Sequence, residues 1–569
     1  MIEANGAEIV VRLLERFGVS FAAGIPGGSI LPVYDALVTA GVSLRHILVR
    51  QEQAAGFFAQ GIARSTGRPG VCFATSGPGA MNLLTAVADA RADSVPLLVI
   101  TGQVNTECIG TDAFQEVDTF GLSFPITKHS VMVKSAAELP ETLAAAFALA
   151  QAGRPGPVLV DIPRNVQLEK ASFSSWPDPA QYAGRFSGSR SSAAETVRTL
   201  AQAVTLLSSA SRPVVFSGGG CNSPEASAAL LRLLEVFPAP VVSTLMGLGS
   251  VPAGHPLFLG MVGMHGTQTA NRAVHGSDVL LAVGARFDDR ATGEIRSFCP
   301  SAKIIQIDID AAEIDKLLPS ALSVVSPAAP ALSALAEQLA GCRGTRARRL
   351  WIETVQQNRE TEQSRSCSAV NAFLASVPAA AARAGVDPQD IIVTTDVGQH
   401  QMWAAQSWPV SAPRRFLTSG SLGTMGFGLP AAMGAAAVHP EKRVLCFSGD
   451  GSIQMNVQEL ATLAENDFSV TVFVLDNGTL GMIRQQQDFS FGGRHSACVF
   501  SRPPDLLRVA AAYGIPAVEA GAPGWENAAF QGRGPRFVRL RVDPSADVLP
   551  YVVPGDANIN SRTRPPEFR

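Results

Sequence analysis

Short apolar runs alternate with helical, alanine-rich stretches along almost the whole chain, and many of the runs end at a glycine or an aspartate. A continuous apolar run is typical of a strand in a parallel sheet that is covered on both faces. Strands that alternate with helices predict βαβ units and doubly wound parallel sheets, an α/β fold class. The runs lie at 46–50, 95–102, 157–163, 213–220, 279–287, 304–310, 390–398, 443–451 and 470–478.

Two stretches interrupt this alternation and predict linkers between domains. Residues 166–192 are rich in Ser, Gly and Pro, and residues 341–368 are rich in charge. Between and after them we expect three domains and a tail, at 1–165, 193–340, 369–545 and 546–569. A chain of 569 residues is too long for a single core, which agrees with this division. The first and third blocks are similar in size and in their alternation of apolar runs and helical stretches.

The composition excludes several classes of protein. A formal net charge of −3 and a pI near 6.3 provide no basic surface for nucleic acid. No apolar run reaches the ~20 residues of a membrane span, and the N-terminal AEIVVRLLERFGV is an amphipathic pattern rather than a signal peptide. The eight cysteines are scattered without a C-x-x-C pair, which fits a reducing compartment. We therefore expect a cytoplasmic protein with no nucleic-acid or membrane partner.

One acidic residue stands between two glycines at the end of a predicted strand, in RVLCFSGDGS. This residue is Asp450, and the next predicted strand ends at Asn477. The carboxyl ends of parallel strands meet at one edge of the sheet, so the two side chains are expected to face one point. Carboxylate and carboxamide oxygens suit Mg²⁺, and Gly449 and Gly451 let backbone N–H groups approach a phosphate. The alternative interpretation is a Gly-Asp turn without a ligand.

A second candidate carboxylate lies in the first block. Glu52 stands where the strand in LRHILVRQEQ passes into an Ala/Gly-rich helix, and a Gly-rich loop at 75–79 leads into another helix. The alternative interpretation of Glu52 is a helix-start carboxylate favoured by the helix dipole.

The GDGS motif followed by an asparagine after a helix and a strand resembles the diphosphate–Mg²⁺ signature of thiamine diphosphate enzymes. That signature usually ends in Asn-Asn, whereas this chain has Asp476-Asn477. Further motifs, in the same order along nearly the whole chain, resemble the large catalytic subunit of acetolactate synthase (acetohydroxyacid synthase). They are GIPGGSILPVYDAL, SGPGAMN, IGTDAFQEVD, PITKH, GRPGPVLVDIP, GARFDDR, TTDVGQHQMW, TSGSLGTMGFGLPAAMGAA and PGDAN.

The resemblance implies three α/β domains that bind the pyrimidine ring, FAD and the diphosphate, in chain order, and an active site shared between the subunits of a homodimer or a dimer of dimers. It implies that Glu52 stabilises the imino form of the aminopyrimidine ring, which removes the thiazolium C2 proton. The other catalytic positions implied are Gly28, Gln115 and Arg290, of which Arg290 receives the carboxylate of the second 2-oxo acid. An ion pair of Arg290 with Asp288 or Asp289 is the alternative.

The resemblance also implies three sets of binding residues. The thiamine diphosphate contacts are Gln399, His400, Met425, Gly449, Gly451 and Ser452, and the Mg²⁺ ligands are Asp450, Asn477 and the Thr479 carbonyl. The FAD contacts are Arg154, Gly218, Gly219, His265, Arg286 and Asp308, for a flavin with a structural role. The substrate pocket is formed by Phe114, Met264, Ile483 and Gln486.

The reaction implied is the decarboxylation of pyruvate on thiamine diphosphate and transfer of the hydroxyethyl unit to a second pyruvate or to 2-oxobutyrate. The products are 2-acetolactate and 2-aceto-2-hydroxybutyrate, in the synthesis of branched-chain amino acids. The family often has a separate small regulatory subunit, which is a possible partner.

The chain departs from the family at several positions. Gln486 replaces a Trp that supports preference for 2-oxobutyrate and contacts herbicides, and Asn105 replaces a Pro at another herbicide contact. Pro327 replaces an Asp that contacts FAD, which predicts a weaker flavin site. Arg164 and Gln51 replace a Lys and a His.

The sequence disfavours three alternatives to acetolactate synthase. Another thiamine diphosphate carboligase, such as glyoxylate carboligase or sulfoacetaldehyde acetyltransferase, is disfavoured by the FQEVD and FDDR motifs, and the first also by Glu52. A catalytically silent scaffold or regulatory homologue should have lost Glu52, Asp450 or Asn477, and all three are present. A nicotinamide dehydrogenase is disfavoured because no G-x-G-x-x-G follows a strand into a helix.

Overall fold

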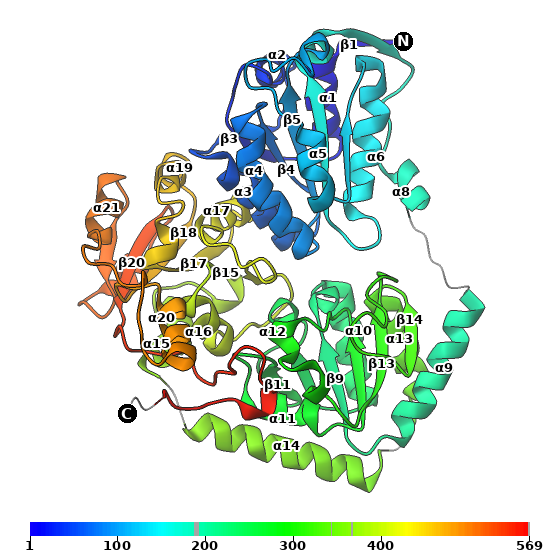
Figure 1. Ribbon diagram of the computed structural model, residues 1–569, viewed down its shortest axis with the longest axis vertical. Helices are drawn as coiled ribbons and strands as arrows, with labels where there is room; N and C mark the ends of the chain where they lie inside the picture. The colour runs from blue at the N-terminus through cyan, green and yellow to red at the C-terminus, as the bar shows by residue number, and fades with distance from the viewer. Residues whose placement is uncertain (187–192, 343, 366–367, 567–569) are drawn as a thin grey trace.

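The computed structural model describes residues 1–186, 193–342, 344–365 and 368–566, and it contains three domains, each built on a six-stranded parallel sheet. Figure 1 shows the first domain in blue and cyan, the central domain in green and the third domain in yellow to red. The α/β fold class with doubly wound sheets is confirmed. No helix of the described residues is long and apolar enough to cross a membrane.

The first domain has the strand order β3-β2-β4-β5-β7-β6. A short antiparallel pair, β1 (Ile2–Asn5) with β8 (Lys170–Phe173), lies apart from this sheet. The strands are β2 (Phe21–Gly24), β3 (Arg45–Leu48), β4 (Gly70–Ala74), β5 (Leu97–Gln103), β6 (His129–Met132) and β7 (Pro157–Pro163). The helices are α1 (Gly6–Arg16), α2 (Leu31–Thr39), α3 (Glu52–Thr66), α4 (Pro78–Ala92), α5 (Thr119–Ser123), α6 (Leu139–Gln151), α7 (Arg164–Leu168) and α8 (Ala180–Phe186).

The central domain has the order β11-β10-β9-β12-β13-β14, in which the chain changes direction across the sheet between β9 and β12. This is the strand order of a dinucleotide-binding sheet, whose ligand lies at that switch point. The strands are β9 (Pro213–Ser217), β10 (Val241–Ser243), β11 (Phe258–Met261), β12 (Val279–Val283), β13 (Lys303–Asp308) and β14 (Leu322–Val325). The helices are α9 (Ala193–Ser209), α10 (Pro224–Val236), α11 (Gln268–His275), α12 (Asp289–Thr292) and α13 (Ala328–Leu339).

The third domain has the order β16-β15-β17-β18-β20-β19, which repeats the order of the first domain strand for strand and accounts for their similar rhythm in the sequence. Its switch point lies between β15 and β17. The strands are β15 (Ile391–Thr395), β16 (Phe416–Leu417), β17 (Arg443–Gly449), β18 (Val470–Asp476), β19 (Ala517–Glu519) and β20 (Arg536–Arg541). The helices are α15 (Ala369–Arg383), α16 (Gln399–Ser407), α17 (Gly428–Val438), α18 (Asp450–Ile453), α19 (Glu459–Glu465), α20 (Gly481–Phe491), α21 (Leu506–Ala512) and α22 (Trp525–Phe530).

The first and third domains share one hydrophobic core, because α3 packs directly on α17. Glycines make this close approach possible. A Cβ at Gly61 would overlap the Ala431 carbonyl oxygen, and a Cβ at Gly434 would overlap the carbonyl oxygen of Phe58. The Ala/Gly-rich sequences of the two helices are therefore a packing requirement of this interface.

Both linker predictions are wrong for most of their length. In the 166–192 stretch, β8 pairs with β1 and the buried Tyr182 of α8 packs into the core of the first domain, because apolar residues are interspersed among the Ser, Gly and Pro. In the 341–368 stretch, α14 (Arg346–Arg365) is a long helix packed along the central domain. Its Glu362 carboxylate accepts the N–H groups of Gln268 and Thr269, the first turn of α11. Residues 187–192, 343 and 366–367 lie outside the described residues.

The C-terminal segment after 545 runs back over the central domain (Figure 1). The Val552 N–H donates to the Met264 carbonyl, and the Asn558 side chain donates to the carbonyl of Ala291 at 2.8 Å. Val548 and Tyr551 are fully buried. The predicted tail is therefore packed on the central domain as far as Asn558, and 567–569 lie outside the description.

Candidate active site

Glu52 is the first residue of α3, immediately beyond the carboxyl end of β3. Gln51 already caps this helix, because its side chain accepts the Gln53 N–H at 2.6 Å. The Glu52 carboxylate is left to accept a hydrogen bond from the Asn82 amide of α4 at 2.9 Å. The carboxylate therefore has a partner outside its own helix, and its place in the first turn also fits a helix-start carboxylate.

Gly28 lies in the loop after β2, and this loop is tied to the loop after β4. The Ser29 N–H donates to Thr75 Oγ1 at 3.3 Å, and the Ser29 and Ser76 hydroxyls are 2.8 Å apart. A Cβ at Gly28 would meet no atom within 4 Å, so this backbone faces open space in the single chain.

Gln115 lies against the same β4 loop. A Cβ at Gly77 would lie 2.8 Å from the Gln115 carbonyl oxygen, so the glycine permits the contact. Gln115 has a positive φ of 60°, which is rare for a residue with a side chain. The neighbouring Phe114 is 88% exposed. The predicted residues Glu52, Gly28, Gln115 and Phe114 therefore gather at the carboxyl edge of the first sheet.

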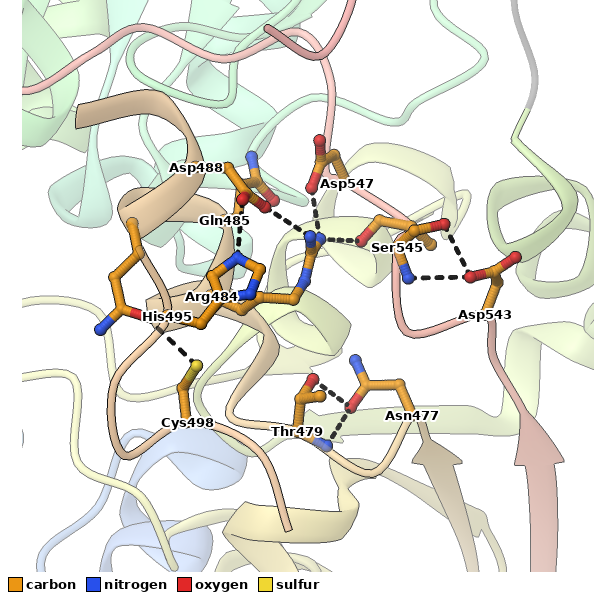
Figure 2. Close-up of polar contacts among 12 residues, drawn as sticks. Asn477, Thr479, Arg484, Gln485, Asp488, His495, Cys498, Asp543, Ser545 and Asp547 are labelled. Atoms are coloured by element: carbon orange, nitrogen blue, oxygen red, sulfur yellow. Dashed lines mark hydrogen bonds and ion pairs between the residues drawn. The ribbon is translucent and has the colours of Figure 1, made fainter. Parts of the chain in front are cut away.

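Asp450 and Asn477 directly follow neighbouring strands, β17 and β18, as the spacing predicted. Asp450 Oδ2 accepts the N–H of Gly478 at 2.8 Å, which places the carboxylate against the loop that carries Asn477. The Asn477 Oδ1 accepts the N–H and hydroxyl of Thr479 at 3.1 and 3.0 Å (Figure 2). The three predicted metal ligands are thus brought together.

Asp450 is a buried carboxylate for which no ion pair is found among the described residues. Burial, with the nearby Asp476, raises the pKa of Asp450 to about 7. The described residues contain no group of three or more His, Cys, Asp or Glu side chains placed to hold a metal. One carboxylate, one carboxamide and one backbone carbonyl are oxygen donors of the kind that suits Mg²⁺ that also binds phosphate oxygens.

His400 and Gln399 begin α16, directly after β15 at the switch point. A Cβ at Gly449 would lie 2.8 Å from the His400 ring, so the glycine admits the imidazole. Burial lowers the pKa of His400 to about 3, and its Nε2 has no hydrogen-bond partner among the described residues. Gln399 accepts from Asn477 at 3.2 Å, and the Ser452 hydroxyl donates to the Val397 carbonyl at 2.7 Å. The predicted diphosphate residues surround the metal ligands.

Met425 lies in the loop before α17, and two sets of carboxylates that the sequence analysis did not single out hold this loop. Asp396, at the end of β15, accepts the Gly426 N–H at 2.8 Å, and burial raises the pKa of Asp396 to about 6. From the first domain, Asp89 accepts the Thr424 hydroxyl at 3.0 Å, and Asp93 accepts the Gly420 N–H at 2.9 Å. The loop of Met425 is therefore held by its own domain and by the first domain.

A cavity of about 1000 Å³ lies at the carboxyl edge of the central sheet and is lined by all three domains. It is large enough for a nucleotide cofactor. Five of the six predicted flavin residues line it: Arg154, Gly219, His265, Arg286 and Asp308. Gly218 is not among the described residues that line it, because this glycine packs against the Gly284 carbonyl. Pro327, at the position where the family has Asp, also lines the wall.

The polar groups of this cavity are only partly paired. Arg154 donates to Glu313 at 2.6 Å and to Ser94 at 2.8 Å, whereas the buried His265 Nδ1 has no partner among the described residues. Burial lowers the pKa of His265 to about 3 and raises the pKa of Asp308 to about 6. An acidic group at the end of β13 is suited to hydrogen bonds from ribose hydroxyls.

The same cavity brings together three of the residues predicted for substrate. Met264, Arg290 and Gln486 line it, and Arg290 lies 3.7 Å from both the Met264 sulfur and the Asp289 carboxylate. The Arg290 guanidinium is largely exposed, so its ion pair with Asp289 is a weak surface pair that leaves it free to bind a carboxylate. Ile483, on the same helix α20 as Gln486, is exposed and is not among the described lining residues. Glu52 and Gln115 are not among them either.

A buried network supports α20, and the sequence analysis did not predict it. The Arg484 guanidinium lies between Asp488 and Asp547, at 2.5 Å from each carboxylate (Figure 2). Gln485 exchanges hydrogen bonds with the backbone of Val548 and accepts one from Gln399. The helix that carries Ile483 and Gln486 is thereby fixed to the C-terminal segment and to the diphosphate residues.

Comparison with known proteins places this arrangement in a family. Models of the thiamine pyrophosphate enzymes match the N-terminal TPP binding domain at residues 4–122, the central domain at 200–335 and the C-terminal TPP binding domain at 396–538. The chain is 44% identical over 563 residues to the acetolactate synthase isozyme 1 large subunit of Escherichia coli (strain K12), covering 97% of each chain. It is 44% identical over 558 residues to the isozyme 2 large subunit of the same organism, covering 97% of this chain and 98% of the relative. It is 43% identical over 560 residues to the probable acetolactate synthase large subunit of Methanocaldococcus jannaschii, covering 97% of this chain and 94% of the relative.

Proposed function

The chain belongs to the thiamine pyrophosphate enzymes and, within them, to the acetolactate synthase large subunits, and we propose that it joins two 2-oxo acids. Pyruvate loses CO₂, and its two-carbon unit passes to a second pyruvate or to 2-oxobutyrate. The products are 2-acetolactate and 2-aceto-2-hydroxybutyrate, at the start of branched-chain amino-acid synthesis. The presence of Glu52, Asp450 and Asn477 at the two matched cofactor-binding domains carries this proposal.

The residues around the β15/β17 switch point would hold thiamine diphosphate, which would supply a nucleophilic carbon and an acceptor for the electron pair released by decarboxylation. Asp450, Asn477 and the Thr479 carbonyl would hold Mg²⁺ between the protein and the diphosphate. The buried Asp450 carboxylate has no ion pair among the described residues, and His400 Nε2 has no hydrogen-bond partner among them, so a cation and a phosphate would fit these two groups.

Glu52 would exchange a proton with the aminopyrimidine ring, and Met425 would support the bound cofactor. Gly28 would let backbone approach the reacting centre, and it faces open space in the single chain. Arg290 would receive the carboxylate of the acceptor, since a guanidinium binds a carboxylate through two hydrogen bonds. Gln486 and Met264 would set the space for the acceptor's alkyl group.

FAD would occupy the cavity at the β9/β12 switch point. Arg154 and Arg286 would pair with its phosphates, and the Asp308 carboxylate would accept a hydrogen bond from a ribose hydroxyl. The size of the cavity, the strand order and the unpartnered His265 Nδ1 support this assignment. Pro327 cannot donate or accept through its side chain, so we propose a flavin site of reduced affinity.

The active site would form between two chains of a homodimer. Apolar side chains are exposed next to Glu52 and Gln115 on the first domain and next to Asn477 on the third, and exposed patches of this kind mark protein interfaces. They are Met81, Phe114, Phe120, Leu122 and Phe124 on the first domain, and Leu422, Met455, Ile483 and Val499 on the third. Pairing of these two surfaces between chains would close both half-sites.

Two further assignments follow from the relatives and the thiols. The relatives are named large subunits, so we propose a small regulatory subunit as a partner. The cysteines of the described residues are all free thiols, which supports work in the cytoplasm.

The function is tested by giving the purified protein pyruvate and 2-oxobutyrate together, with thiamine diphosphate, Mg²⁺ and FAD, and resolving the products by NMR. Both acetohydroxyacids are expected. Parallel reactions with glyoxylate and with sulfoacetaldehyde plus phosphate identify the other carboligases. Failure to form either acetohydroxyacid would overturn the proposal.

A further inference from the structure

The loop between β5 and α5 carries Phe114 and Gln115 and has an unusual backbone. Gln115 and Asp112 have positive φ angles of 60° and 58°, and Gly110 has a φ of 81°. Residues with a side chain adopt this region only where the surroundings impose it. The loop therefore needs a specific set of contacts to present Gln115 and Phe114 in one conformation.

A single carboxylate supplies most of these contacts. The Glu116 side chain accepts the backbone N–H groups of Gly110 and Thr111 on one arm of the loop and of Ala113 near its tip. The distances to Thr111 and Ala113 are 3.3 and 3.0 Å. The Glu116 N–H also donates to the Ala113 carbonyl at 2.9 Å. Hydrogen bonds from N–H groups to an ionised carboxylate are stronger than neutral ones, so this charge closes the loop on itself.

The base of the loop is fixed independently of Glu116. The Gln103 side chain donates to the Val117 carbonyl and to the buried Asp161 carboxylate, both at 3.0 Å. The Thr101 hydroxyl donates to the same carboxylate at 2.7 Å. Loss of the Glu116 charge should therefore loosen residues 110–115 while the ends of the loop stay attached to the sheet.

We propose that Glu116 is a positioning residue whose carboxylate holds Phe114 and Gln115 in the geometry that receives the second 2-oxo acid. This role rests on the proposed carboligase function. Glu116 acts through the backbone of its own loop, whereas Glu52 acts on the cofactor ring. The two residues should therefore affect different steps.

The test compares E116Q with D112N in the holoenzyme with thiamine diphosphate, Mg²⁺ and FAD. The amide of E116Q keeps the size of the side chain but removes the charge and one acceptor. D112N removes an equal charge from the same loop at a carboxylate that accepts no hydrogen bond from Gly110, Thr111 or Ala113. Asparagine also tolerates the positive φ of that position.

We expect E116Q to raise the KM for pyruvate by about 10-fold or more and to change the ratio of the two acetohydroxyacids. We also expect faster amide hydrogen exchange in residues 110–115, with an unchanged rate of C2 proton exchange on the cofactor. D112N should match the wild type in all four measurements. Equal KM, product ratio and amide exchange for E116Q and D112N would overturn the positioning role alone. A wild-type enzyme that forms neither product would overturn the proposed function, and the positioning role with it.

Discussion

Asp161 provides a quantitative test of how the loop between β5 and α5 is anchored, because the charge state of this carboxyl group depends on burial. The carboxylate accepts hydrogen bonds from Thr101 and Gln103 in the interior of the first domain. Burial raises the pKa of Asp161 to about 7, from an ordinary value of 3.8. Between these two pH values the folded protein holds a proton that the unfolded chain has released. The free energy of unfolding must therefore fall as the pH rises through this window.

The magnitude follows from the width of the window. Each pH unit is worth about 1.4 kcal/mol, so the raised pKa sets an upper limit of about 4 kcal/mol between pH 4 and pH 7. The Asp161→Asn variant is uncharged at every pH and has nearly the same shape, so it lacks this contribution. The stability of the variant relative to wild type should rise steadily from pH 4.5 to pH 7.5 and then level off.

Thermal unfolding of both proteins across that pH range measures the difference directly. A change of 1 kcal/mol shifts the Tm of a domain of this size by about 2–4 °C, so the expected divergence is several degrees. Asp112→Asn is the matched control, because Asp112 is exposed, and its Tm difference from wild type should not vary with pH. If the Tm of Asp161→Asn relative to wild type stays constant or falls as the pH rises, the proposed link between the raised pKa of Asp161 and stability is refuted.

Two further predictions concern the reaction itself. Glu52→Gln should retain thiamine diphosphate binding, measured by calorimetry. The rate of C2 proton exchange should fall by about 10²-fold or more, because proton transfer from a positioned side chain accelerates a reaction by about 10²–10⁴-fold. An unchanged exchange rate would contradict the role of Glu52. Gln486→Trp places an aromatic ring in the cavity that Met264 and Arg290 also line. The share of 2-aceto-2-hydroxybutyrate formed from equal concentrations of pyruvate and 2-oxobutyrate should therefore rise. An unaltered product ratio would show that Gln486 does not set acceptor preference.

The fold could be predicted as far as the apolar pattern is continuous. The runs at 443–451 and 470–478 form β17 and β18 because both are buried on the two faces of the sheet. The two-residue strand β16 gives no such signal, since its pairing with β15 depends on partners distant in sequence. The helix α14 was predicted to be a linker because its sequence is rich in charged residues. The contacts that dock it on the central domain, such as those from Arg348 to the carbonyls of Leu207 and Ser208, cannot be recognised from the sequence.

Some residues of the candidate site could likewise be predicted from the sequence, and others could not. Asp450 and Asn477 were found because strand ends in a parallel sheet meet at one edge, which spacing alone reveals. Asp396 and Glu116 were not found, although both lie in motifs that the resemblance includes. Their partners are backbone N–H groups, as in the bond from Gly426 to Asp396, and a backbone donor leaves no trace in residue identity. An isolated acidic residue beside a Gly-rich loop was the one available signal.

The site is proposed to combine Glu52 of one chain with Asp450 and Asn477 of its partner, and hybrid dimers test this most directly. Glu52→Gln and Asp450→Ala chains, carrying different affinity tags, are co-expressed, and the hybrid is isolated by two purifications. Each variant alone should keep about 1% of wild-type acetolactate formation or less. The hybrid contains one site with both residues intact, so it should recover about half of the wild-type activity per dimer. Hybrid activity no higher than that of the separate variants would show that both residues serve one chain, and would contradict the account.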